Sequence, residues 1–473
     1  MKTWRVTVCL LVMALCQEVH STGPLRAQFP RVEKPTYQPG VDPGSPLFLT
    51  PYIMKGEIQT AQKLSMVTGL PGYQGKSYSG FLTVDSKYNS NMFFWYFPTQ
   101  ASPSAPLMLW LQGGPGGSSL FGLFNENGPV LVNKDIKLEL RQYGWTNKYS
   151  MLYIDNPVGT GFSFTDSDQG YSRNETHVAE NLYNALTQFF MLFPEIKKNP
   201  FYITGESYAG KYVPAIAYKI LQEGPASKVP LSGIAVGDGF SDPEVMLLQY
   251  ADYIYNIGMF DENQRDFFQA KSKQAATLIQ QGKYIEAFKL WNNLLNGDQE
   301  KVPSFFFNAT GSTNYYNYLL CNAPPEFGYY GQFLAMPIVR RAIHVGNLTY
   351  HNGDKVETML INDIMQSVKP WLAHVMDSTK VMLYSGQLDI IVAAPLTEAM
   401  LLTVPWKGLP EYRSATKQVW KVDPSDPEVA GYVRVVDNFV QVIVRGGGHI
   451  LPYDQPRRSF HMIDKFITDQ KFW

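Results

Sequence analysis

Short apolar runs alternate with helix-like patterns along most of this 473-residue chain. Apolar runs without polar alternation are typical of strands that helices bury on both faces. Six such runs occur, at 106–111, 150–154, 201–204, 233–236, 381–384 and 440–444. The segments 80–84 and 91–97 have the pattern of a hairpin, and 176–193 has the clearest helical spacing. This alternation predicts an α/β fold with a central, mostly parallel sheet and helices on both faces.

One long stretch, residues 243–375, departs from this alternation. Its first half has helical patterns, its second half is rich in aromatic residues, and it contains no clear buried strand. We expect a helical cap inserted into a core that comprises 47–242 and 376–473. A length of about 150 residues per domain would suggest three domains, but a capping insertion explains the pattern without a third one.

The amino terminus has the pattern of a targeting segment. Lys2 and Arg5 precede an apolar run that ends at Cys16, and small residues follow. This order predicts a secretory signal peptide over 1–21, with an apolar core too short to cross a bilayer. No later stretch is long and apolar enough, so no membrane span is expected. Residues 22–46 contain six prolines and are interpreted as a flexible arm or pro-segment.

Three acceptor sequons support passage through the secretory pathway. They predict glycosylation at Asn174, Asn308 and Asn347. Two of the three cysteines lie in the predicted signal peptide, so the mature chain keeps Cys321 alone. We interpret it as a buried structural thiol rather than a nucleophile. A chain of this size can rely on its hydrophobic core without disulfides.

Charge and composition exclude several classes of protein. The 40 Lys and Arg balance 41 Asp and Glu, so nucleic acid is not an expected partner. A hydrophobic content of 45% excludes intrinsic disorder. The sequence has no Cys/His cluster and no His-Glu-x-x-His motif, so neither a metal nor another cofactor is predicted.

The segment 201–210 has the pattern of a nucleophile elbow. A buried strand leads into Gly-Glu-Ser-Tyr-Ala and then into a helical pattern, with Ser207 at the turn. Small residues on both sides of the serine permit the sharp turn that exposes its hydroxyl. Alone, the pattern also fits an ordinary strand–turn–helix, so the assignment depends on its partners.

A nucleophilic serine needs a base and an acid that orients the base. Asp389 directly follows the run at 381–384, and His449 lies in a glycine-rich loop after the run at 440–444. Active groups of open α/β sheets gather at the carboxyl ends of strands. The order Ser207, Asp389, His449 therefore predicts a catalytic triad. His177 and His461 are interpreted as surface or packing residues.

The glycine-rich segment 110–119 follows another predicted strand. Such a turn lets backbone N–H groups approach the oxyanion that develops during acyl transfer. A phosphate-binding loop is the alternative, but the Gly-Lys-Ser/Thr ending is missing.

Taken together, these segments resemble the serine carboxypeptidases of the α/β-hydrolase superfamily, from about Pro46 to Pro456. The resemblance rests on WLQGGPGGSS (110–119), ENGP (126–129), DNPVGTGFS (155–163), GESYAGKYVP (205–214), GQLD (386–389) and GGGHILPYDQP (446–456). It implies that Ser207 is the nucleophile of a hydrolase, His449 its base and Asp389 the partner of the base. It also implies that the oxyanion donors are the N–H groups of Gly114 and Tyr208.

The same resemblance implies peptide substrates with a free C-terminus. Their carboxylate would be held by Gln112, Glu126 and Glu206, with help from the N–H of Gly113. Two glutamates repel a carboxylate unless they are protonated, so acidic pH should favour binding. This suits a lysosomal or endosomal compartment, with secretion as the alternative. A homodimer is an expectation from the resemblance alone.

Two departures from the family pattern leave alternatives open. Gln112 stands where the family has Asn, and Gly117 stands where it has Cys. The longer amide could misplace the carboxylate, which would favour an esterase or acyltransferase on the same scaffold. A non-catalytic binding or protective glycoprotein is a third alternative, which the intact triad disfavours.

Overall fold

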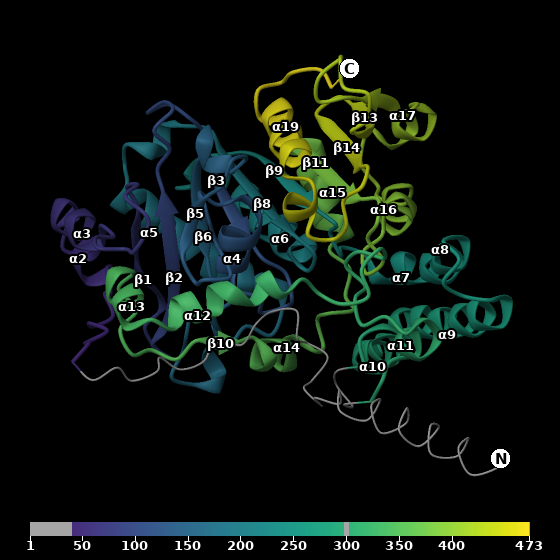
Figure 1. Ribbon diagram of the computed structural model, residues 1–473, viewed down its shortest axis with the longest axis horizontal. Coiled ribbons are helices and arrows are strands. Elements are labelled where there is room, and N and C mark those ends of the chain that lie inside the picture. The colour runs from purple at the N-terminus through teal and green to yellow at the C-terminus, as the bar shows by residue number, and fades with distance from the viewer. Residues whose placement is uncertain (1–39, 298–301, 473) are drawn as a thin grey trace, which may run out of the picture.

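A ten-stranded mixed sheet forms the centre of the protein (Figure 1). The computed structural model describes residues 40–297 and 302–472. The six central strands run parallel, and the pairs at both edges are antiparallel. In spatial order, the strands are β1 (Tyr78–Asp85), β2 (Ser90–Phe97), β6 (Ser150–Ile154), β3 (Leu107–Leu111), β8 (Phe201–Glu206), β9 (Leu231–Gly237), β11 (Lys380–Gly386), β14 (Phe439–Val444), β13 (Gly431–Val436) and β12 (Gln418–Trp420).

The six predicted buried runs are the six parallel strands, and the predicted hairpin is β1 with β2. Each parallel strand lies between two neighbours, and most of its side chains are buried. This burial removes the alternation of polar and apolar residues. The α/β prediction is therefore confirmed.

Helices cover both faces of the sheet. Phe201 of β8 contacts Phe190, whereas its neighbour Tyr202 contacts Phe466. Successive side chains of a strand point to opposite faces, so α5 and α19, which carry these two phenylalanines, lie on opposite sides. On the α5 side, α6 packs between α5 and α15. The helices of the core are α2 (Thr50–Met54), α3 (Ile58–Ser65), α4 (Ser119–Phe121), α5 (Glu175–Leu192), α6 (Ala209–Gln222), α15 (Lys369–Ser378), α16 (Ala394–Leu401), α17 (Leu409–Ser414), α18 (Leu451–Asp454) and α19 (Pro456–Ile467).

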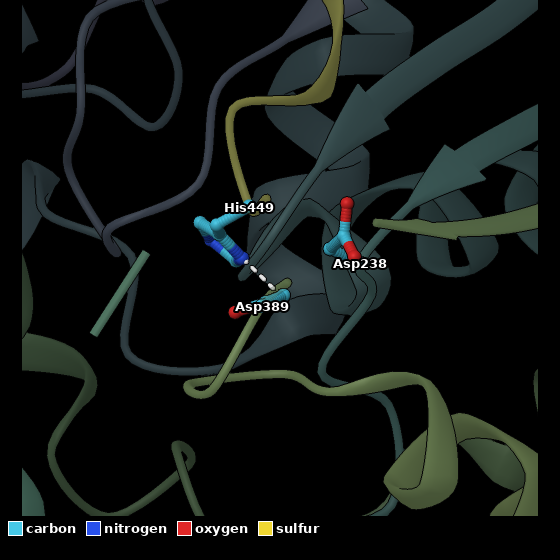
Figure 2. A group of neighbouring side chains, drawn as sticks. All are labelled: Asp238, Asp389 and His449. Carbon is cyan, nitrogen blue, oxygen red and sulfur yellow. Dashed lines mark hydrogen bonds and ion pairs between the residues drawn. The ribbon is translucent and has the colours of Figure 1, made fainter. Parts of the chain in front are cut away.

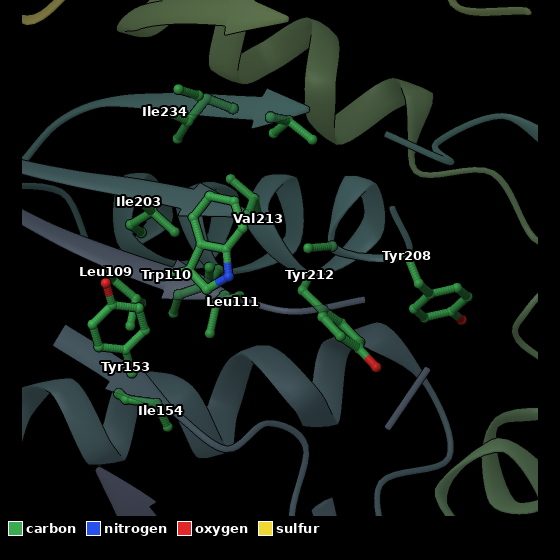
Figure 3. Packing of buried hydrophobic residues seen from close by; sticks show 14 of the residues in the cluster. Leu109, Trp110, Leu111, Tyr153, Ile154, Ile203, Tyr208, Tyr212, Val213 and Ile234 are labelled. Atoms are coloured by element: carbon green, nitrogen blue, oxygen red, sulfur yellow. The ribbon is translucent and has the colours of Figure 1, made fainter. Parts of the chain in front are cut away.

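The interior beside the elbow is closely packed (Figure 3). Figure 3 shows Val213 and Tyr212 of α6 near Trp110 of β3 and Ile203 of β8. These four side chains are all fully buried. The packing fixes α6, and with it the turn before α6, against the carboxyl ends of the parallel strands.

The stretch 243–375 is helical, as its patterns indicate. Figure 1 shows α7 to α11 gathered beyond one end of the sheet and α12 to α14 below it. Within this stretch the described strand β10 (His351–Asn352) has two residues and pairs with β7 (Thr160–Gly161). The limits of the cap stay a prediction. Its helices are α7 (Pro243–Met246), α8 (Tyr250–Asn256), α9 (Glu262–Gln280), α10 (Tyr284–Leu295), α11 (Phe305–Thr310), α12 (Tyr329–Ala335), α13 (Pro337–Ala342) and α14 (Asp354–Leu360).

Several predictions concern the ends and surface of the chain. The predicted signal peptide and residues 22–39 of the predicted arm lie outside the described residues. In the described part of the chain, no helix has the length and apolar character needed to cross a membrane. The prediction of a buried Cys321 is wrong, because its side chain is exposed. The residue lies in an irregular surface segment between α11 and α12, where its carbonyl group, not its thiol, is held by Thr313.

Candidate active site

Ser207 occupies the turn between β8 and α6, as the elbow pattern predicts. Its φ is +63°, in the left-handed region that costs a residue with a side chain about 1–3 kcal/mol. The end of β9 and the loop after it hold it there: the Ser207 N–H donates to the carbonyl of Gly237, the last residue of β9, at 3.0 Å, and the Ser207 carbonyl accepts from the Phe240 N–H at 2.9 Å. The side chain is half-buried. The backbone therefore maintains a strained turn with an accessible serine.

Two glycines permit the close packing around this turn. A Cβ on Gly205 would lie 2.4 Å from the carbonyl oxygen of Leu111, and one on Gly210 would lie 2.4 Å from the Phe240 nitrogen. Both contacts are to backbone atoms, which cannot move aside as a flexible side chain can. The glycines are thus required by the close approach of β3 and of the loop after β9.

Asp389 and His449 form a buried hydrogen-bonded pair (Figure 2). Asp389 follows β11, His449 follows β14, and Nδ1 of the imidazole lies 2.8 Å from Oδ2 of Asp389. The backbone N–H of His449 donates to the Tyr316 carbonyl at 2.6 Å, and the centroid of the Tyr316 ring lies 4.6 Å from that of the imidazole ring. The predicted acid and base therefore meet, and an aromatic residue of the cap stretch helps to position the base.

Backbone contacts hold the acid loop and the histidine loop together. The Leu388 N–H donates to the Gly447 carbonyl at 2.7 Å, and the Gln387 N–H donates to the Val444 carbonyl at 3.0 Å. A Cβ on Gly386 would lie 2.0 Å from the Gly448 carbonyl oxygen. Only glycine at 386 allows this approach, which brings the two loops into one unit.

The other ring nitrogen of the base, Nε2 of His449, is buried. No residue in 40–297 or 302–472, Ser207 included, makes a hydrogen bond with it. The loops that carry Ser207 and His449 leave the same edge of the sheet, at β8 and β14, with β9 and β11 between them. In substrate-free enzymes the nucleophile–base hydrogen bond is often formed only when substrate arrives. The Ser207–His449 hydrogen bond stays a prediction.

The glycine-rich segment lies directly against the elbow. A Cβ on Gly113 would be 2.5 Å from the Tyr208 nitrogen and 2.6 Å from the Ser207 Cβ. Neither the Gly114 N–H nor the Tyr208 N–H donates a hydrogen bond to any residue that the structure describes. Two backbone donors beside the nucleophile are what an oxyanion hole needs.

A second buried polar group adjoins the elbow through Glu206. Nε2 of Gln112 donates to Oε1 of Glu206 at 2.7 Å, while Oε1 of Gln112 accepts from Nε1 of Trp110 at 2.8 Å. Gln112, Glu126 and Glu206 are each exposed by 1% or less. We call these three residues the carboxyl cluster. The longer amide of Gln112 is fixed at both ends, so its donor has a defined direction.

Burial favours the protonated form of both glutamates in the cluster. It raises the pKa of Glu126 to about 8, although the neighbouring Glu206 and Gln112 side chains and the charge of Arg141 oppose the rise. Burial also raises the pKa of Glu206 well above its ordinary value, and the nearby charge of Glu126 raises it further. Two negative charges repel each other strongly when both are buried away from water. Glu126 and Glu206 together therefore keep at least one proton at acidic and neutral pH.

Comparison with known proteins agrees with this geometry. The family model described as serine carboxypeptidase matches residues 69–469. The chain belongs to the serine carboxypeptidase family. It is 54% identical over 467 residues to the human protein named probable serine carboxypeptidase CPVL, covering 98% of this chain and 97% of that protein. It is 43% identical over 434 residues to the vitellogenic carboxypeptidase of Aedes aegypti, covering 91% of each chain.

A solved structure shares the fold over most of its length. The prohormone-processing carboxypeptidase Kex1 from Saccharomyces cerevisiae superposes with a TM-score of 0.74 and 25% identity. The match covers 86% of this chain and 96% of that structure. This carboxypeptidase is thus a hydrolase with the α/β-hydrolase fold, as the resemblance implied.

Sequence reasoning missed three residues of this carboxypeptidase site. Tyr316 lies in the cap stretch, where no pattern connects it with His449. Arg141 is half-buried near Glu126 and donates to the Phe124 carbonyl at 2.5 Å, which its charged side chain did not suggest. Asp238 could have been found, because it directly follows the buried strand β9 in the way that Asp389 follows the segment of β11.

Asp238 lies beside the acid–base pair. One ligand-type atom from each of Asp238, Asp389 and His449 lies within 4.8 Å of the others, a grouping that could also suggest a metal site. However, Nδ1 of His449 is engaged with Asp389, and His449 is the base of the predicted triad. A role of this group in acid–base chemistry stays a prediction.

The remaining predicted residues lie at the surface or in packing contacts. Asn174, Asn308 and Asn347 are exposed, so sugar attachment is sterically allowed at all three. His177 is half-buried at the start of α5. Nδ1 of His461 accepts a hydrogen bond from Nε1 of Trp420 at 3.0 Å, and the two rings stack.

Proposed function

We propose that this carboxypeptidase releases the C-terminal amino acid of peptides through an acyl-enzyme on Ser207. The observation that carries the proposal is the carboxyl cluster, which is buried and protonatable and joins the elbow through Glu206. A neutral carboxyl group and an amide can donate hydrogen bonds to a substrate carboxylate. The cluster therefore selects a chain end beside the nucleophile.

The reaction follows from the positions of the triad and of the backbone donors. The Ser207 hydroxyl attacks the last peptide carbonyl while His449 accepts its proton, and Asp389 stabilises the resulting imidazolium. The N–H groups of Gly114 and Tyr208 hold the developing oxyanion. The imidazolium then donates its proton to the departing amine. Water, deprotonated by His449, finally cleaves the ester and regenerates Ser207.

Acidic to neutral pH should favour the binding step over alkaline pH. The carboxyl cluster can donate to a substrate carboxylate only while it holds a proton. Burial raises the pKa of Glu126 to about 8, so the cluster acquires negative charge and repels the substrate carboxylate as the pH rises through this value. KM for peptides with a free C-terminus should therefore rise with pH.

The proposed setting is the secretory pathway, in a lysosomal, endosomal or secreted form. The sequence pattern of residues 1–21 and the exposure of the three sequon asparagines support it. The carboxyl cluster keeps its proton at the pH of a lysosomal or endosomal compartment, so it can bind a substrate carboxylate there. A homodimer and the absence of nucleic acid partners stay predictions.

The direct test compares a peptide with its C-terminal amide between pH 4.5 and 8.5. We expect the free acid to be cleaved about 10- to 100-fold faster in kcat/KM, because hydrogen bonds to a charged group contribute about 1.5–3 kcal/mol. The Ser207→Ala variant provides the inactive control. Equal cleavage of acid and amide would overturn the assigned role of the cluster. Cleavage of esters but not of peptides would favour the esterase or acyltransferase alternative, and no turnover at all would favour a binding protein.

A further inference from the structure

Asp238 is a buried carboxyl group that the proposed mechanism does not use. It follows β9 with φ +46°, and its N–H donates to the Tyr384 carbonyl at 2.7 Å. Its Oδ1 accepts a hydrogen bond from the Gly386 N–H at 2.8 Å. Its Oδ2 is buried and accepts no hydrogen bond from the residues that the structure describes. Figure 2 shows Asp238 and His449 both beside Asp389, whose Oδ2 makes the hydrogen bond with His449.

Two ionised carboxylates cannot both be stable in this volume. Asp389 must carry the charge that stabilises the imidazolium during catalysis, so the proton of the pair belongs on Asp238. Burial raises the pKa of Asp238 well above its ordinary value, and the charge of Asp389 raises it further. The titratable groups around Asp238 are Glu206, Tyr253, Tyr384, Asp389, His449 and Asp454.

We propose that Asp238 is a positioning residue which keeps a proton on Oδ2 and donates it, as a hydrogen bond, to the carboxylate of Asp389. This inference rests on the proposed triad and deepens it. The hydrogen bond draws negative charge away from the side of Asp389 that faces His449. The protonated imidazole is then stabilised less, so a larger fraction of His449 stays neutral in acid and can act as the base. Asp238 neither gains nor loses its proton during turnover.

This arrangement answers a difficulty in the proposed function. A histidine base loses its function once it is protonated, and the ordinary value for histidine is about 6.5. The carboxyl cluster, in contrast, keeps its proton through the whole acidic and neutral range, so the base sets the acidic limit of the reaction. A neutral acid behind Asp389 brings the two requirements together, since it lowers the basicity of the imidazole without removing the carboxylate that orients it.

The test measures the rate at which a phosphonofluoridate labels Ser207 between pH 4 and 8. This reaction needs the neutral base but no peptide, so it is independent of the carboxyl cluster. In Asp238→Asn the amide still donates to Asp389, and we expect the profile of the wild type. In Asp238→Gly, which tolerates the positive φ, the donor is lost. We expect the acidic limb of its pH–rate profile to move up by about one pH unit, so that labelling on this limb is about tenfold slower than in the wild type. Asp238→Ala should behave as Asp238→Gly.

If Ser207 is labelled in both the wild type and Asp238→Gly and their pH profiles coincide, the role of Asp238 is overturned, whereas the assignment of Ser207 as the nucleophile stands. A profile of Asp238→Asn shifted upward in pH would also overturn it, and this variant decides the question if the smaller ones do not fold. Absence of labelling in the wild type at every pH would overturn the proposed nucleophile and this inference together.

Discussion

Glu126 has an environment in which a single proton decides what the residue can bind. It lies on a π-helix, η1 (Gly122–Asn127), with its side chain buried near Glu206 and Gln112. Single π-helical turns are often found at functional sites. In the proposed function, the protonated side chain donates to a substrate carboxylate, and the ionised side chain repels one.

Replacing Glu126 by glutamine tests this dependence on pH. A glutamine side chain cannot ionise, so the first ionisation of the cluster is lost and the alkaline rise in KM should move to higher pH. At pH 8.5 we expect the KM of Glu126→Gln for a free-acid peptide to be lower than that of the wild type, by up to about tenfold. Steady-state kinetics at pH 5, 7 and 8.5 provide the measurement. Glu286→Gln, a change in α10 far along the chain from the cluster, should follow the wild type. An unchanged rise in Glu126→Gln would show that this glutamate does not control binding.

The positions of the three proposed triad residues could be predicted because each lies within five residues of the end of an apolar run. Ser207, Asp389 and His449 follow segments whose lack of alternation marks them as buried strands, and the sheet geometry gathers their ends. The Gln112 amide position could not be predicted, because its hydrogen bonds to Trp110 and Glu206 depend on side-chain packing. The prediction for Cys321 failed since burial was inferred from residue type alone.

At the scale of elements, α6 fixes the elbow by packing against the loop after β9. Gly210 lies in its first turn, and a Cβ there would meet the Phe240 nitrogen and atoms of Gly239 within 2.4–2.7 Å. The Ser241 hydroxyl also donates to the Gly210 carbonyl at 2.7 Å. These contacts connect the start of α6 with the element that holds Ser207.

Gly210→Ala should therefore lower both stability and activity. Overpacking of a close contact costs about 1–3 kcal/mol, and any shift of α6 displaces the Tyr208 N–H. Urea unfolding measures the first effect, and kcat at saturating peptide measures the second. Lys219→Ala, at the other end of α6, removes a surface ion pair with Glu223 and a contact of the ammonium with the Tyr183 ring, and should change stability by about 1 kcal/mol or less. Equal stability of Gly210→Ala and wild type would contradict the packing argument.

The pattern of elements shows which parts of a fold a sequence encodes locally. Buried strands and the long helix α5 have continuous or periodic signals and were predicted close to their observed limits. Strand β13 alternates between buried and exposed residues at the edge of the sheet, and β12 has three residues, so neither produced a clear signal. The short helices of the cap stretch depend on contacts with the core, which no local pattern records.

At the scale of the whole molecule, several buried acids link stability to pH. Burial raises the pKa of Glu126 and Glu175 to about 8 and that of Asp155 to about 7. Their values in an unfolded chain are near 4. The folded protein therefore holds more protons between these limits, so its stability falls as pH rises.

Three half-buried histidines act in the opposite direction at lower pH. Burial lowers the pKa of His344, His351 and His461, so they favour the fold above about 6.5 and lose this contribution as pH falls. Between pH 6.5 and 8.5 the buried acids make the main contribution to the pH dependence of the free energy of unfolding. We expect the free energy of unfolding to fall by roughly 1–4 kcal/mol over this range.

Urea unfolding at pH 6.5, 7.5 and 8.5 measures this loss. In Glu175→Gln, which cannot ionise, the decrease should be smaller. Stability that increases from pH 6.5 to 8.5 would mean that these acids are ionised in the folded protein.

The central claim is that Ser207, His449 and Asp389 act as one catalytic unit at the edge of the sheet. The most direct test measures kcat/KM for a free-acid peptide at pH 5 in Ser207→Ala, His449→Ala and the double variant, with folding checked by circular dichroism. The account predicts that each single change lowers kcat/KM by about 10⁴-fold or more and that the double variant is no worse, since residues of one unit lose their joint contribution only once. Ser207→Ala with activity close to that of the wild type, or losses that multiply in the double variant, would contradict the account.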